Sequence, residues 1–218
     1  WLQKAYDIIG RSLEADFVVV YNPQTGLFRG ESSFIDWREQ SYPVWAQPAD
    51  IYMSECLGTN AAYYGVLKVM EDMATILGKK KDVKKYGQKA EALKKAINDN
   101  FWVEEDGYYA SYLYGRQNLT RTQQSETLGE SFCVLFGIAD EERAAKVISS
   151  MPVGEFGPPI FSPQIVSQPD YHNNGVWPYV TSFWGKAAAK AGNETALMHA
   201  LACNVRTASL YATNYENY

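Results

Sequence analysis

Hydrophobic side chains recur every three or four residues along most of the chain, which is the spacing of one face of an α-helix. Polar residues fill the other positions, so the pattern predicts amphipathic helices joined by short turns. The predicted helices cover 1–15, 55–77, 83–97, 122–136, 140–151, 179–191 and 194–211. Gly78, Gly137 and Gly192 stand between consecutive helices, and glycine commonly ends a helix. The expected fold class is therefore all-α, built from αα-hairpins.

Three segments depart from this pattern. The run 17–21 is β-branched and aromatic and predicts a strand, and the turn residues 22–26 then lead into Leu27-Phe28, so we expect a small β-hairpin near the N-terminus. The run 108–113 predicts a short extended piece. Residues 153–169 are rich in Pro, Gly and Ser without a period, which predicts a long loop, and such loops are often functional.

Composition narrows the classes of function. The 218 residues include 46% hydrophobic ones and carry a net charge of −5, so we expect a packed core and no nucleic-acid partner. No apolar run approaches the roughly 20 residues of a membrane span. The three cysteines are far apart, which predicts buried free thiols and no metal site. No linker divides the chain, so one domain over residues 1–218 is expected.

The most unusual stretch is the run from Gly30 to Trp45. Charged and aromatic residues fall on every face of any helix or strand that this stretch could form, so we expect it to lie on a loop. Carboxylates beside aromatic rings suit a carbohydrate site, because acids move protons and flat rings stack on sugar faces. The residues of interest in this stretch are Glu31, Asp36, Trp37, Arg38 and Glu39.

Two further polar and aromatic loops follow, at 170–178 and 213–218. Hydrolysis of a glycosidic bond commonly needs two carboxyl groups, and in inverting enzymes they stand roughly 6.5–9.5 Å apart. The first loop offers Asp36 and the last offers Glu216, and a ring of helical hairpins would bring such distant positions together.

The run ESSFIDWREQSYPVW resembles the general-acid loop of inverting glycosidases built on an (α/α)6 toroid, such as trehalases and processing α-glucosidases of the glucosidase I type. One extra residue separates the Ser from the Asp here. The resemblance implies that Asp36 is the proton donor. It also implies that Glu31, Trp37, Arg38 and Glu39 line the sugar pocket.

The run YHNNGVWPYVT is similar to a segment of bacterial debranching-type enzymes in the same structural group. This similarity implies that His172 and Asn173 bond sugar hydroxyls while Tyr171 and Trp177 wall the site. The terminal YENY resembles the Glu-Lys-Tyr element of trehalase-like members, which implies that Glu216 is the water-activating base. The run DNFWVEEDGYYASYL also resembles the helix-to-loop segment of this group.

The hypothesis is thus an inverting glycosidase acting on an α-glycosidic bond, most simply an α-glucoside, with an oligosaccharide or glycoside as substrate and no cofactor. About seven helices are predicted, fewer than a closed toroid needs, so the chain is expected to be part of one. The resemblance slightly favours a periplasmic or secreted location and leaves the oligomeric state open.

Other interpretations of the same residues stay open. Asp36 could be a plain loop or capping acid, Arg38 and Glu39 a structural ion pair, and Glu216 an ordinary acid. His199 is expected to pack inside its helix. At the level of the whole chain, the alternatives are a non-catalytic helical array that binds glycans or proteins and, below it, a sugar epimerase or lyase.

Overall fold

The computed structural model describes residues 1–31, 42–166, 168, 170–213 and 215–218. Helices dominate these residues. The longer ones are α1 (Leu2–Val19), α4 (Leu57–Ile76), α5 (Lys80–Phe101), α6 (Thr127–Phe136), α7 (Glu141–Ser150), α9 (Pro178–Lys190) and α10 (Glu194–Tyr211). Two short helices, α3 (Pro48–Met53) and α8 (Asp170–Asn174), lie within connections between longer helices. The prediction of an all-α fold is confirmed.

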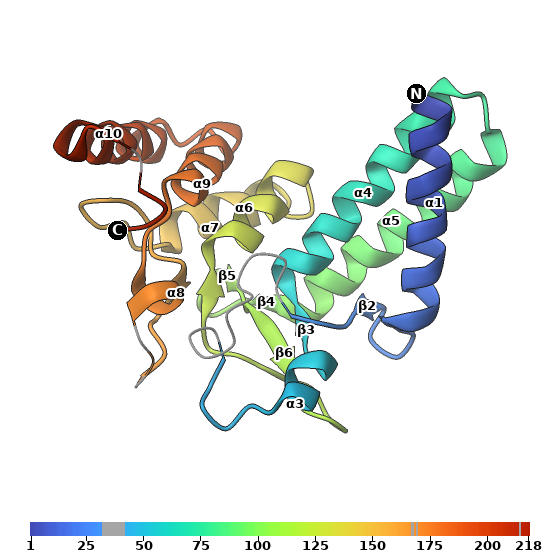
Figure 1. The fold of residues 1–218 in the computed structure, drawn as a ribbon, viewed down its shortest axis with the longest axis horizontal. Coiled ribbons are helices and arrows are strands. Elements are labelled where there is room, and N and C mark those ends of the chain that lie inside the picture. Colours follow the sequence, from blue (N-terminus) through green and yellow to red (C-terminus); the bar gives the residue numbers. More distant parts are fainter. Residues whose placement is uncertain (32–41, 167, 169, 214) are drawn as a thin grey trace.

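Three helical hairpins follow one another along the chain: α4 with α5, α6 with α7, and α9 with α10 (Figure 1). Helix α6 packs against α4 on one side and against α9 on the other, so these three first helices form one layer. Helix α1 joins the first hairpin, where the Tyr6 hydroxyl donates a 2.8 Å hydrogen bond to Asp82 and the Tyr6 ring meets the edge of Tyr86. The arrangement is an arc of helical hairpins.

Small antiparallel ladders occupy the long connections between hairpins. Their strands are β1 (Tyr21–Asn22), β2 (Leu27–Phe28), β3 (Glu55–Cys56), β4 (Trp102–Val103), β5 (Tyr108–Tyr109), β6 (Tyr112–Tyr114), β7 (Thr120–Arg121), β8 (Ser125–Glu126) and β9 (Phe161–Ser162). Strand β1 pairs with β2, β4 with β5, and β8 with β9, while β6 lies between β3 and β7. The ladders β3–β6–β7 and β8–β9 join connections that are far apart in the sequence, and they do so at one end of the hairpins.

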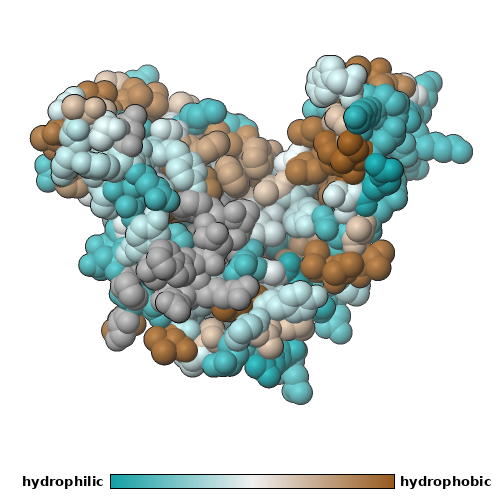
Figure 2. All heavy atoms as spheres, in the orientation of Figure 1, coloured by the Kyte–Doolittle hydropathy of each residue, from teal (hydrophilic) through white to brown (hydrophobic). Residues whose placement is uncertain are grey.

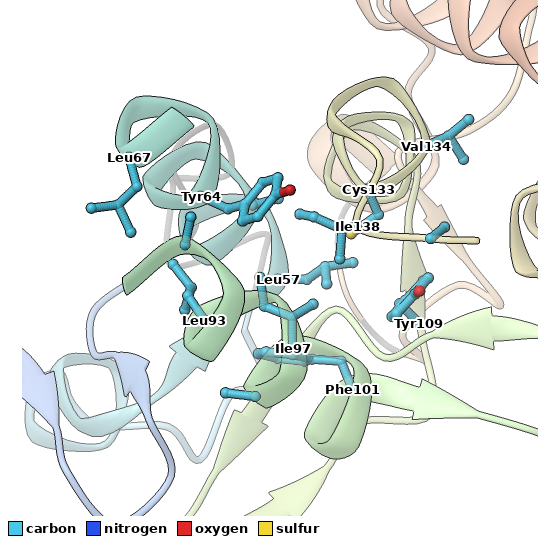
Figure 3. Packing of buried hydrophobic residues seen from close by; sticks show 14 of the residues in the cluster. Leu57, Tyr64, Leu67, Leu93, Ile97, Phe101, Tyr109, Cys133, Val134 and Ile138 are labelled. Atoms are coloured by element: carbon cyan, nitrogen blue, oxygen red, sulfur yellow. The ribbon is translucent and has the colours of Figure 1, made fainter. Parts of the chain in front are cut away.

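The main core lies between the helices of the arc. Figure 3 shows Leu57 and Leu67 of α4 facing Leu93 and Ile97 of α5, with Cys133 of α6 closing the far side. All of these side chains are buried. Fully burying one such aliphatic side chain contributes about 1.5–3 kcal/mol, so the shared core holds the hairpins together. A second, smaller core surrounds Trp177 beside α9.

The predicted strand at 17–21 is wrong in its first part. Helix α1 continues through Val19, and only Tyr21 of that run enters the hairpin. The ring of Phe17 packs 4.9 Å from the Phe28 ring and 5.0 Å from the Tyr21 ring, so tertiary contact retains helical backbone where β-branched residues favour a strand. The β-hairpin over Tyr21–Phe28 is confirmed.

Two predicted helices begin later than expected. Helix α4 starts at Leu57 instead of 55, and α6 starts at Thr127 instead of 122. In both cases the residues just before the helix pair with another strand, β3 with β6 and β8 with β9. The backbone N–H groups there are bonded across a ladder, which the hydrophobic period along the chain does not reveal.

Other local predictions are confirmed. Gly78, Gly137 and Gly192 have φ values of +70°, +77° and +74° at the ends of helices, and the Asn193 side chain accepts a 3.0 Å bond from Ala196 N as the cap of α10. The three cysteines are free and buried. In the described part of the chain no helix is long and apolar enough to cross a bilayer.

Candidate functional site

The long connections 20–56, 102–126 and 151–177 meet at the N-terminal ends of α4, α6 and α9. Each of these helices starts directly after an extended residue that serves as its N-cap, namely Cys56, Glu126 and Trp177. Since the three helices lie side by side, their first turns form one surface. The described parts of the three loops that were predicted to carry function reach this end of the hairpins or connect to it.

The first predicted loop is anchored at the start of α4. Gly30 N donates a 2.7 Å hydrogen bond to Ser54 O, and the Thr59 hydroxyl donates a 2.8 Å bond to the backbone carbonyl of Glu31. Glu31 therefore lies beside the first turn of an inner helix. Asp36, Trp37, Arg38 and Glu39 lie outside the described residues.

The second predicted loop contains a short helix, α8, where a loop was expected. The ring of His172 lies 4.9 Å from the Tyr171 ring and 5.2 Å from the Trp177 ring, and Tyr171 meets Trp177 edge-on at 5.0 Å. The His172 and Trp177 side chains are both buried. The structure thus joins three of the predicted sugar-contacting residues in one aromatic cluster.

Asn173 has a structural set of partners. Its Oδ1 accepts a 2.6 Å bond from Ile165 N, and its Nδ2 donates to Ile165 O at 2.9 Å and to Gln168 O at 3.4 Å. The side chain is 3% exposed. These bonds fasten the preceding loop to α8, the short helix that also carries Tyr171 and His172.

The C-terminal segment joins this cluster through the backbone. Val176 N donates to Tyr218 O at 2.9 Å, and Tyr218 N donates to Val176 O at 2.9 Å. This exchange places Glu216 next to the start of α9. Both Glu216 and Trp177 line a pocket of about 480 Å³, together with Pro178, Tyr179, Ser182, Asn204 and Tyr215.

Sequence reasoning missed three buried carboxyl groups at the same end of the helices. Glu126 is 2% exposed, and its oxygens accept 2.9 Å bonds from Leu128 N and Gly129 N, so it caps α6. Glu130, one turn later, accepts from Tyr109 N at 2.9 Å. Glu55 accepts from Asn22 and Thr25 at 2.7 and 2.9 Å. The available signal was an acid at a core-facing position of each segment.

Burial dominates the electrostatics of these groups. It raises the pKa of Glu126 to about 7 against the pull of its two backbone donors, and it raises the pKa of Glu130 well above the usual range. The pKa of Glu55 is also raised by burial. Burial raises the pKa of the Cys56 thiol to about 12, with the charges of Glu126 and Glu31 adding to the shift. Glu31, Cys56 and Glu126 are therefore electrostatic neighbours at the start of α4.

Trp102 and Trp184 are buried in the core. His199 was expected to pack, and this is wrong, because its side chain is exposed on α10. Among the described residues, no group of three His, Cys, Asp or Glu side chains is placed to hold a metal ion.

An arc of helical hairpins whose long connections gather at the N-terminal ends of the inner helices is the architecture of the (α/α)6 toroid class. The family model of the bacterial α-L-rhamnosidase six-hairpin glycosidase domain matches residues 1–153. The chain belongs to this six-hairpin glycosidase family.

Solved structures show the same fold. A GH78 family rhamnosidase of Bacillus sp. GL1 aligns over 100% of this chain and 20% of its own, with 19% identity and a TM-score of 0.69. Neutral trehalase Nth1 from Saccharomyces cerevisiae aligns over 78% of this chain and 35% of its own, with 14% identity and a TM-score of 0.63. The chain therefore spans a fifth to about a third of these proteins. No curated protein sequence matches it significantly.

Proposed function

We propose that this protein hydrolyses an α-glycosidic bond with inversion, with Asp36 as the general acid and Glu216 as the base that activates water. The substrate class is an oligosaccharide or glycoside with a terminal α-glucosyl or α-L-rhamnosyl unit. The α-glucosyl unit follows from the sequence resemblance, and the rhamnosyl unit follows from the name of the matching family.

The observation that carries the proposal is the position of Glu216. A carboxylate near the end of the sequence is fastened by the Val176–Tyr218 backbone exchange to the segment that holds Trp177, and both border one pocket. An inverting base needs a carboxylate oxygen open to water, and the exposed rings of Tyr179 and Tyr215 in the same pocket offer a sugar an aromatic wall.

The first loop supplies the acid in this proposal. Its entry at Glu31 is fixed on α4, whose first turn adjoins that of α6. A general acid working near neutral pH needs a raised pKa, which an apolar surround or a nearby negative charge provides. Glu31 is one such charge, and Phe34 and Ile35 are the apolar sequence neighbours of Asp36.

The same proposal assigns the chain to part of a larger toroid. The inner helices leave an apolar cleft of about 620 Å³ that includes Val66 and Val69 of α4 and Phe132 and Phe136 of α6. Figure 2 shows hydrophobic side chains along the notch between the two raised ends of the molecule. Soluble proteins usually cover such a surface, and further helices of a toroid would do so. A monodisperse, fully active monomer of these 218 residues would contradict this assignment.

The test compares three variants on p-nitrophenyl α-glucoside, p-nitrophenyl α-L-rhamnoside and trehalose. Asp36→Asn and Glu216→Gln should each lower kcat by about 100-fold or more while sugar binding persists, because each removes a proton-transfer group. Glu105→Gln, which changes an exposed carboxyl in a turn, is the matched control and should retain full activity.

The stereochemistry gives an independent readout. Proton NMR of the first product formed should show the anomer opposite to that of the substrate. Retention of configuration would overturn the inverting mechanism. Normal turnover in Asp36→Asn or Glu216→Gln would remove that residue from the mechanism, and binding without any hydrolysis would favour a non-catalytic glycan-binding array.

A further inference from the structure

A row of four aromatic rings runs outward from the start of α4. The Tyr42 ring lies 5.1 Å from the Tyr112 ring, the Tyr112 ring 6.1 Å from the Tyr114 ring, and the Tyr114 ring 5.5 Å from Trp45. The inner end is buried, where the Tyr42 hydroxyl contacts the Cys56 thiol at 3.5 Å. The outer end, Trp45, is 56% exposed. The row connects the base of α4 with the molecular surface.

The exposed end of the row is held by its neighbours. Arg116, two residues beyond Tyr114, donates from Nε to Asp50 Oδ1 at 2.6 Å. Asp50 also accepts from Gln47 N at 3.0 Å, at the start of α3. These bonds join the segment that carries Trp45 to the strand that carries Tyr114. The exposed indole of Trp45 therefore lies on a segment that hydrogen bonds hold in place.

Hydrogen-bonding groups border the outer end of the row. Arg116 belongs to a polar pocket of about 320 Å³, whose other lining residues include Arg29, Gln117, Asn118 and Met53. The Nε of Arg116 is committed to Asp50, and its terminal Nη atoms carry further donors. Charge is balanced here, since Arg116 faces Asp50 and Arg29 lies near the buried Glu55 carboxyl. A neutral, hydroxyl-rich ligand matches this chemistry better than an anion.

We infer that Trp45 and Tyr114 form a stacking platform for a distal unit of a neutral oligosaccharide, with Arg116 bonding its hydroxyls. This inference rests on the proposed function, because the distal sugar unit belongs to an oligosaccharide whose reacting bond lies in that site. Trp45 stands at the end of the run that carries Asp36, and Gln168 of the 153–169 segment donates a 2.9 Å bond to Tyr42 O at the inner end of the row. Tyr42 and Tyr112 are buried in the row, so Trp45 and Tyr114 at its outer end are the rings that a sugar can contact.

Binding is measured first, without relying on turnover. Maltotetraose and rutinose are titrated by calorimetry into the wild type, Trp45→Ala and Tyr114→Ala. Loss of one stacking face should weaken binding of at least one of these oligosaccharides by about fivefold or more. Trp1→Ala is the matched control, because it removes an indole that is 94% exposed on α1, and its affinity should equal that of the wild type.

Kinetics then separate the platform from the reaction centre. For the bound oligosaccharide, Trp45→Ala should raise KM with kcat unchanged, whereas its kinetics on the single-sugar p-nitrophenyl glycosides should not change. Trp45→Phe, which keeps a flat ring, should recover most of the affinity. Thermal unfolding of each variant establishes that it is folded, and Trp45→Phe and Tyr114→Phe replace any alanine variant that is not.

The outcomes distinguish this inference from the proposed function. Oligosaccharide binding that depends on Trp45, without hydrolysis of any glycoside, supports the platform and overturns the hydrolase. Hydrolysis with unchanged oligosaccharide affinity in Trp45→Ala overturns the platform and leaves the hydrolase standing. Absence of binding of both oligosaccharides to the wild type counts against the platform as well.

Discussion

The two ends of the helical hairpins are built in opposite ways. At one end the chain turns within 77–79, 137–140 and 191–193, each time through a glycine with positive φ. At the other end the connections 20–56, 102–126 and 151–177 carry the small ladders, the buried carboxyl groups and the aromatic cluster. We call the end with the glycine turns the short end and the end with the long connections the long end. The short end closes the hairpins, and the long end carries the candidate site.

The difference shows how one fold separates stability from function. A glycine turn needs only local backbone geometry and leaves no polar group buried. At the other end, Glu55 and Glu126 of the long connections and Glu130 in the first turn of α6 are buried. A buried carboxyl costs folding free energy unless its hydrogen bonds compensate. Carboxyl groups retained at such a cost mark the end of the arc where function is expected.

The largest expected effect concerns the pH dependence of the long end. Because the folded-state pKa of Glu126 is raised from 4.5 to about 7, folding favours its protonated form. The contribution of Glu126 to the free energy of unfolding should therefore be largest below pH 4.5 and should fall by roughly 3 kcal/mol as the pH rises to 7. Urea unfolding between pH 4.5 and 8 measures this slope.

Glu126→Gln serves as the test variant, since it keeps the shape and removes the ionisation. The free energy of unfolding of this variant should depend less steeply on pH. The dependence that remains is due to Glu130, whose pKa is also raised. An identical pH dependence in wild type and variant would show that Glu126 ionises normally in the folded protein.

A slightly smaller effect is expected where two inner helices touch. A Cβ at Gly129 would lie 2.6 Å from Glu126 Oε2 and 2.9 Å from Gly58 N. The second neighbour is backbone of α4 and cannot rotate away. Gly129→Ala should lower the free energy of unfolding by about 2–3 kcal/mol, measured by urea unfolding. Gly154→Ala, where the nearest atom to the added Cβ is Gly157 O at 3.6 Å, is the control and should be close to neutral.

A Gly→Ala substitution in a turn of the short end should lower the free energy of unfolding by less. Gly137 has φ +77° with open space around its Cβ position, since the nearest atom is Lys190 Nζ at 3.9 Å. Gly137→Ala should therefore cost only the left-handed backbone penalty, about 1–2 kcal/mol. Glycosidase activity, measured below the unfolding temperature, should stay unchanged. A loss of activity greater than the loss of folded protein would refute the separation between the two ends.

The smallest effect is expected at a surface ion pair. Lys95 and Asp99 pair one turn apart on α5, and both side chains are largely exposed. Lys95→Ala should change the free energy of unfolding by no more than about 0.5 kcal/mol, because solvent screens such pairs. Thermal unfolding at low and high salt would detect any larger contribution.

The sequence predicted the helices well because their hydrophobic stripes and glycine stops are local features. It failed at 17–21, where Phe17 packs on Phe28, and at the starts of α4 and α6, where strand pairing replaces the first helical turns. The loops at 170–178 and 213–218 were singled out by their residue types. Their junction through Val176 and Tyr218 depends on two backbone hydrogen bonds between distant segments.

By itself, then, the sequence determined the periodicity, the turns and the family resemblance, since each of these is encoded by neighbouring residues. Only the tertiary structure decided which carboxyl groups are buried, because burial depends on what the rest of the chain places around them. It also decided that Trp45 stands exposed while Tyr42 is covered. The two rings are three positions apart, and their different exposure arises from packing against β6 and its neighbours.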